Sequence, residues 1–101
     1  MLDSESVSAL QKAIKDLHGC DSFFVGAVSL VETFEDRVVW QGVVHVFDLS
    51  GHASAKQCYA WASPTDSGKL RYYAVLHSPP VDSPQAAVRA AIVRDHREGS
   101  V

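Results

Sequence analysis

The sequence predicts an α+β fold: a four-stranded antiparallel meander sheet with an N-terminal and a C-terminal helix, both on one face (α-β-β-β-β-α). Three observations lead to this prediction. Helical spacing of apolar residues occurs only near the two ends, four β-rich segments lie between them, and the connections are short. Strands joined by short turns pair with their neighbours in sequence. The 101 residues are the size of one domain (1–101), whose ends 1–3 and 98–101 we expect to fray.

The first helix is expected over residues 4–18. Its apolar residues form a single stripe with helical spacing: Val7, Leu10, Ile14 and Leu17. Gly19 follows at the position where a residue in the left-handed conformation commonly ends a helix. A single stripe indicates a helix that covers one face of a sheet.

The segment 23–49 is predicted to form two long strands, 23–34 and 38–48, joined at Glu35-Asp36-Arg37. β-branched and aromatic residues dominate both strands, and Gly26 suggests a bulge. Large apolar side chains occupy both faces of this ribbon. That is more apolar surface than a small solvated sheet leaves open, so the segment predicts self-association.

The rest of the sheet is expected at 56–63 and 69–77. The turn 63–68 between these strands contains Pro64 and Gly68. Pro79-Pro80 ends the sheet, because proline donates no ladder hydrogen bond. Ser83 followed by Pro84 is a helix N-terminal signal, and the second helix is predicted over 84–97, with Gly99 closing it.

Aromatic residues provide the main functional signal. If both helices cover one face, Tyr59, Trp61, Tyr73 and Val75 are exposed on the other, although the register of the last hairpin leaves open which face Tyr59 and Trp61 join. Tyr and Trp recur at interfaces and in ligand pockets. Two interpretations follow: a homodimer formed through the helix-free face or the edge of the sheet, and a ligand cleft. The predicted ligand or interface residues are Trp40, His45, Tyr59, Trp61, Arg71 and Tyr73.

The segment His45–His52 gathers imidazole, carboxylate and hydroxyl groups near a strand end. Its candidate catalytic residues are His45, Asp48 and His52, because an aspartate can orient a histidine that acts as a general base. In a regular strand, however, His45 and Asp48 point to opposite faces. The spacing matches no catalytic motif, and turn chemistry explains it more simply.

Composition narrows the possible functions. A net charge of −3 with only nine Lys and Arg residues disfavours nucleic-acid binding. No apolar run is long enough to span a membrane, no signal peptide is recognisable, and Cys20 and Cys58 match no metal-ligand spacing, so we predict a cytoplasmic protein with no metal and no cofactor. The sequence favours a non-enzymatic ligand- or protein-interaction module that homodimerises. The alternatives are a small enzyme using His45, Asp48 and His52, and a regulatory subunit of a larger protein.

Overall fold

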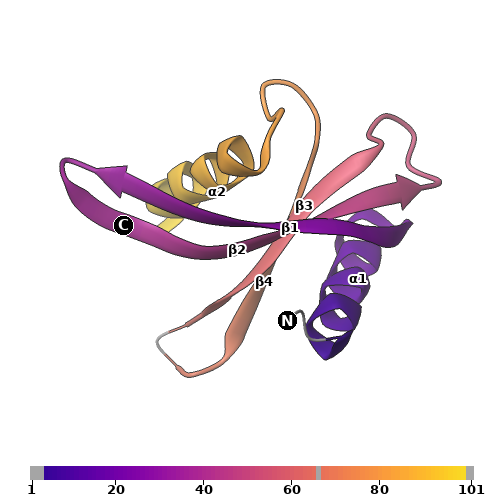
Figure 1. The fold of residues 1–101 in the computed structure, drawn as a ribbon, viewed down its shortest axis with the longest axis horizontal. Helices are drawn as coiled ribbons and strands as arrows, with labels where there is room; N and C mark the ends of the chain where they lie inside the picture. The colour runs from indigo at the N-terminus through magenta and orange to yellow at the C-terminus, as the bar shows by residue number, and fades with distance from the viewer. Residues whose placement is uncertain (1–3, 66, 100–101) are drawn as a thin grey trace.

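The computed structural model describes residues 4–65 and 67–99 (Figure 1). Its elements are α1 (Ser4–His18), β1 (Asp21–Phe34), β2 (Arg37–Ser50), β3 (Gln57–Pro64), β4 (Leu70–Leu76) and α2 (Pro84–Gly99). The strands form one antiparallel sheet in the order β1-β2-β3-β4. The predicted class, element order and meander are therefore confirmed. Of the ends expected to fray, 1–3 and 100–101 lie outside the described residues, whereas the α2 backbone is helical to Gly99.

Both ends of α1 and the start of α2 lie at the residues that the sequence indicated, whereas α2 continues to Gly99, two residues past its predicted end. The Oγ of Ser83 accepts a 3.1 Å hydrogen bond from the backbone N–H of Ala86, which satisfies one of the unpaired donors in the first turn of α2. At the end of α1, Gly19 has a φ of 71° and donates its N–H to the carbonyl of Lys15 at 2.9 Å. Such a left-handed residue lets the chain leave the helix and enter β1 without a Cβ clash.

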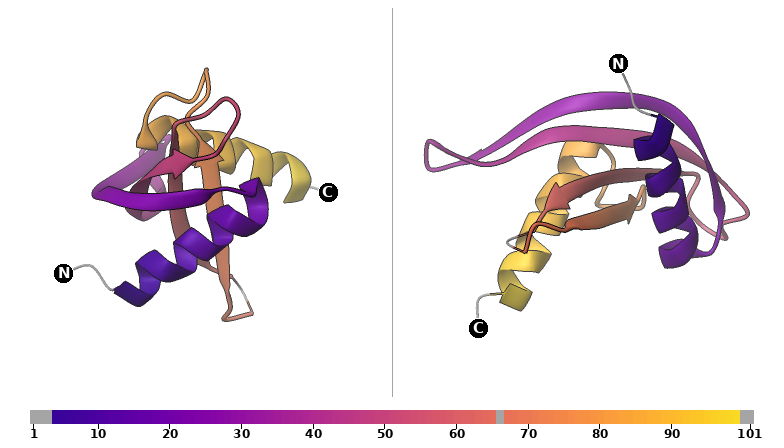
Figure 2. Two further views of the ribbon diagram at one scale, coloured as in Figure 1. Left: turned by 90° about the vertical axis from the view of Figure 1, so that its right-hand side faces the viewer. Right: turned by 90° about the horizontal axis from the view of Figure 1, so that it is seen from below.

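The sheet divides into a long ribbon and a shorter hairpin. β1 and β2 pair from Asp21↔Ser50 to Phe34↔Arg37, with register shifts near Gly26 and Glu32. The first shift is the bulge that Gly26 predicted. β2 pairs with β3 only over residues 45–48, and β3 continues with β4 to Pro64↔Leu70. The part of β2 before His45 has no β3 partner. Figure 2 shows the β1–β2 ribbon arching away from the β3–β4 hairpin.

The two helices pack on opposite faces of the sheet, so the prediction that both cover one face is wrong. Figures 1 and 2 show them near opposite ends of the molecule. The α1 cluster contains Leu10, Ile14, Cys20, Phe47, Cys58 and Ala60. The α2 cluster contains Val44, Tyr59, Trp61, Ala87, Val88 and Ala91.

The alternation of side chains along β3 explains why each face needs its own helix. Cys58 and Ala60 point to α1, while Tyr59 and Trp61 point to α2. Both sets are buried, and a sheet that is apolar on both faces must be covered on both. Because each helix covers only part of its face, the sheet has no wholly helix-free face.

Candidate functional site

The predicted aromatic residues form the core beneath α2. Tyr59 and Trp61 are only 3% and 2% exposed. The Trp61 ring stacks on Tyr73 with a centroid distance of 5.1 Å and an interplanar angle of 5°. The hydroxyl of Tyr73 donates a 2.6 Å hydrogen bond to Oδ2 of Asp95 on α2. The expectation that these rings face solvent is therefore wrong: α2 already occupies the surface that a ligand or second copy would need.

Arg71 also has its partners within the chain. Its guanidinium carbon lies 5.0 Å from the centre of the Tyr73 ring, and its Nη2 is 3.4 Å from Oδ1 of Asp95. Burial raises the pKa of Tyr73, and the hydrogen bond to Asp95 adds to this effect. Arg71, Tyr73 and Asp95 thus connect β4 to α2 and form no open anion site.

Trp40 joins β2 to β3 where their backbones diverge. Its indole meets Trp61 edge-to-face at 6.0 Å, and its Nε1–H donates to Oγ of Ser63 at 3.4 Å. The ring lies against Gly42, where an added Cβ would come within 3.0 Å of Cη2. The side chain of Trp40 thereby links β2 to β3 on the α2 side of the sheet, at the point where the two strands separate.

The three candidate catalytic residues are not brought together. Asp48 is exposed and accepts a 3.1 Å hydrogen bond from Gln57. Nδ1 of His52 accepts the backbone N–H groups of Ser54 and Ala55 at 3.1 and 3.0 Å, so this imidazole stabilises its own loop. His52 lies near His18 at the C-terminal end of α1.

His45 lies at the other end of α1. Its ring lines a cavity with Ser6, so about 18 Å of helix separates His45 from the region of His18 and His52, at 1.5 Å per residue. His45 and Asp48 lie on opposite sides of β2 by the alternation of the strand. The geometry therefore gives no support to an enzyme that uses these three residues in one cleft.

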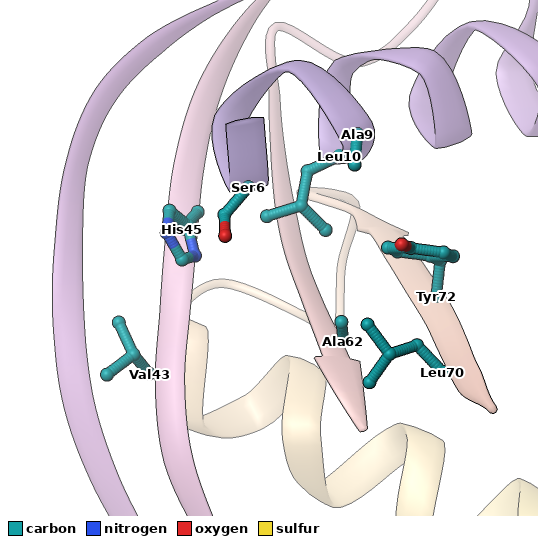
Figure 3. Close-up of a pocket in the computed structure, with 8 residues that line it drawn as sticks. All are labelled: Ser6, Ala9, Leu10, Val43, His45, Ala62, Leu70 and Tyr72. Carbon is teal, nitrogen blue, oxygen red and sulfur yellow. The ribbon is translucent and has the colours of Figure 1, made fainter. Parts of the chain in front are cut away.

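The cavity beside His45 has a volume of about 250 Å³ and lies, open to solvent, between the first turns of α1 and the diverging strands (Figure 3). Nδ1 of His45 is enclosed and has no hydrogen-bond partner within the described part of the chain. Burial lowers the pKa of His45, so the imidazole is neutral at pH 7. The described lining residues are Ser6, Ala9, Leu10, Val43, His45, Ala62, Leu70 and Tyr72.

The ribbon carries most of the exposed apolar surface. Phe34 is 67% exposed and Phe23 59%, although large apolar side chains are usually covered in a monomer. The exposure that the sequence predicted for the ribbon is therefore present, whereas Tyr59 and Trp61 of the predicted aromatic face are buried. The large exposed apolar residues of the ribbon are Phe23, Val25, Val28, Val31, Phe34, Val38, Val39 and Val43.

Sequence reasoning missed one buried charge. Glu32 on β1 is only 8% exposed, and its carboxylate accepts hydrogen bonds from Arg89 and Gln85 on α2. Beside this ion pair a cavity of about 680 Å³ separates the ribbon from α2. The available signal was a single carboxylate within the apolar run of β1, because such a group is buried only when a partner reaches it.

The described residues offer no sign of a metal centre or a membrane-spanning helix. Within 4–65 and 67–99, no three His, Cys, Asp or Glu side chains gather closely enough to hold a metal ion. In that same part of the chain, neither helix combines the length and apolar composition needed to cross a bilayer. Comparison with protein-family models, curated proteins and solved structures finds no match for this chain. The functional proposals therefore depend on the geometry of the chain itself.

Proposed function

We propose that this protein is a non-enzymatic interaction module that homodimerises by antiparallel pairing of the β1 edges of two copies. The observation that carries the proposal is the composition of this edge. β1 is an outer strand of 14 residues, and residues 23–31 contain no charge and no proline. Natural proteins usually protect long edge strands with charges, prolines or a covering element, because the unpaired backbone groups bind other strands.

The side chains around this edge support the same proposal. Val25, Val28 and Val31 project from β1 with 55%, 38% and 48% of their surface exposed. Successive side chains of a strand alternate between faces, so both sides of the edge are apolar. A second ribbon paired with β1 buries these side chains together with the backbone edge.

A two-fold axis suits this arrangement. Rotation by a half turn places a strand antiparallel to its own copy, so one edge is complementary to itself and the assembly closes as a dimer. The two sheets then form one continuous sheet, with β1 and its copy at the centre. The cavity beside His45 stays open, because it lies on the other side of β2 from this edge.

The proposal also includes a reducing compartment, with the cytoplasm as the expected one. Cys20 and Cys58 are both free and buried beneath α1. Burial raises the pKa of Cys58 to about 12, with a smaller contribution from Cys20, so its thiolate form is rare at neutral pH. Reduced, unreactive thiols are typical of cytosolic proteins.

Light scattering coupled to size exclusion tests the dimer. The wild type is expected at twice the chain mass of 11.0 kDa at micromolar concentration. Val28→Lys and Val31→Lys each place a charge beside the paired edge, but on opposite faces of β1. Because each change enters the dimer twice, both are expected to weaken association about tenfold or more.

Leu17→Lys is the matched control, since Leu17 is 59% exposed and lies on α1, outside the β1 strand. It is expected to leave the dimer intact. Dissociation by only one of the two β1 variants would indicate packing of a single sheet face in place of edge pairing. A wild-type monomer across this range contradicts self-association and favours a separate protein as the partner of the ribbon.

A further inference from the structure

We infer that the cavity between α1 and the diverging strands binds a small uncharged molecule with an apolar body and one hydroxyl group. The cavity has a floor from the sheet and a roof from α1 (Figure 3). Val43 and His45 come from β2, Ala62 from β3, and Leu70 and Tyr72 from β4. This site is not part of the proposed dimer interface.

The cavity exists because strand pairing and side-chain size both change at this point. His45↔Ala60 is the last pair between β2 and β3. The residues before His45 on β2 and after Ala60 on β3 are not paired with each other, so their backbones are no longer in close contact. Ala62 is the next β3 residue on this face and is too small to fill the gap. Ser6 and Ala9 are the small residues that α1 places above it. No large side chain therefore occupies the space.

His45 is the polar anchor of the proposed site. Its enclosed Nδ1 lacks a hydrogen-bond partner in the described part of the chain, and such buried groups usually have one. With the ring proton on Nε2, Nδ1 is an acceptor. Nδ1 is buried within the described structure, so the proposal requires a rotation of the ring about χ2 that turns this acceptor toward the cavity. An O–H donor in the cavity then satisfies it.

The lining selects against a charged ligand. None of the described residues around the cavity is Asp, Glu, Lys or Arg, so a ligand ion would lose its hydration without gaining a counter-charge. The lowered pKa of His45 supports the same conclusion, because burial keeps the imidazole neutral. Leu10, Val43 and Leu70 supply apolar contacts for the body of the ligand.

The size of the cavity sets the size of the ligand. A volume of about 250 Å³ lies just below the roughly 300–1,000 Å³ of most small-molecule sites. This space suits a molecule with one ring. Two probes that differ only in the hydroxyl, 4-ethylphenol and ethylbenzene, separate the effect of the apolar body from that of the anchor.

Titration of the full chain with each probe, followed by two-dimensional amide NMR, tests the inference. We expect 4-ethylphenol to bind about fivefold to tenfold more tightly than ethylbenzene, because it makes one more buried hydrogen bond. The shifted amides are expected around Ser6, His45 and Tyr72. Absence of binding by both probes at millimolar concentration, or shifts confined to other regions, would overturn the inference and leave a cavity that holds water only.

Two variants make the test specific. His45→Phe keeps a ring but removes the acceptor, so it should bind both probes with equal affinity; a preference that survives this change contradicts the role of His45. Ala62→Leu fills the cavity and should abolish binding of both probes. Ala90→Leu makes the same change at an exposed site on α2 and should leave binding unchanged. Amide spectra of each variant show whether it remains folded.

The site and the dimer can fail independently. The cavity is complete within one chain, so Val28→Lys should bind 4-ethylphenol like the wild type even if it is monomeric. Loss of binding in that variant, with the fold intact, contradicts a site built by one chain alone.

Discussion

Nε of Arg89 lies 2.8 Å from Oε1 of Glu32, and this contact joins α2 to the far end of β1. Gln85 donates a 2.7 Å hydrogen bond to the other carboxylate oxygen. The hydrogen bond from Arg89, followed by that from Gln85, holds the pKa of Glu32 below its usual value of 4.5. The ribbon thus depends on a charged contact with a helix that is distant in sequence.

This contact predicts a pH-dependent stability. Because the folded-state pKa of Glu32 is lowered, its contribution is complete above the unfolded-state pKa and is lost as the pH falls through the folded value. We expect Glu32→Gln to lower the free energy of unfolding by roughly 1 kcal/mol at pH 7, with the difference shrinking below pH 4.5. Urea unfolding across this range measures it. Glu35→Gln, at the exposed tip of the ribbon, is the control, and an equal effect there would contradict a specific role for Glu32.

Substitution of Trp61 is expected to lower the stability of the fold and to leave the dimer interface itself unchanged. This residue is fully packed between Tyr73 and Trp40, so Trp61→Ala should lower the free energy of unfolding by about 3–5 kcal/mol. Tyr72→Ala, on the α1 side of β4 where the ring is 39% exposed, is expected to cost about 1 kcal/mol or less. Chemical denaturation compares the two. If Trp61→Ala dissociates the dimer but keeps the wild-type free energy of unfolding, Trp61 acts at the dimer interface instead of in the core.

Two glycines of the ribbon are expected to respond differently to alanine. At Gly42 a new Cβ meets the Trp40 ring at 3.0 and 3.1 Å, so Gly42→Ala should displace that ring and cost about 1–3 kcal/mol. At Gly26 nothing lies within 4 Å, and Gly26→Ala should be close to neutral. Unfolding curves and tryptophan fluorescence report both effects. Similar losses of stability in the two variants would contradict the close packing of the Trp40 ring against Gly42.

The tip of the ribbon stores backbone strain that one substitution can relieve. Glu35 and Asp36 have φ values of 52° and 64°, the left-handed region that the favoured two-residue hairpin turn requires. Asp36→Gly is expected to stabilise the fold by about 1 kcal/mol, because Gly adopts this region without a Cβ penalty. Gly19→Ala, at a φ of 71°, should have the opposite sign. Melting temperatures of the two variants test this contrast.

Local patterns predicted the elements of this fold closely. The apolar stripe from Val7 to Leu17 and Gly19 defined α1, and Ser83-Pro84 marked the start of α2. All four predicted strands are present, with ends shifted by at most two residues. These features depend on nearest-neighbour chemistry, namely capping, turn conformation and side-chain period, which acts over a few residues and is visible in the chain.

The candidate site was predicted only in part. His45 was selected and does line a cavity, but its neighbours there, apart from Val43, come from α1, β3 and β4. Asp48 and His52 were selected for being near in sequence, although a strand sends close residues to opposite faces. Glu32 was missed because its partners, Gln85 and Arg89, are more than fifty residues away.

By itself, the sequence determined which residues of each strand share a face: Cys58 with Ala60, and Tyr59 with Trp61. Only the tertiary structure decided that α1 covers the first pair and α2 the second. The reason is that alternation along a strand is local, whereas the side that a helix takes depends on how the whole sheet twists and divides. That division, in which the part of β2 before His45 does not pair with β3, also created the cavity and left the ribbon exposed.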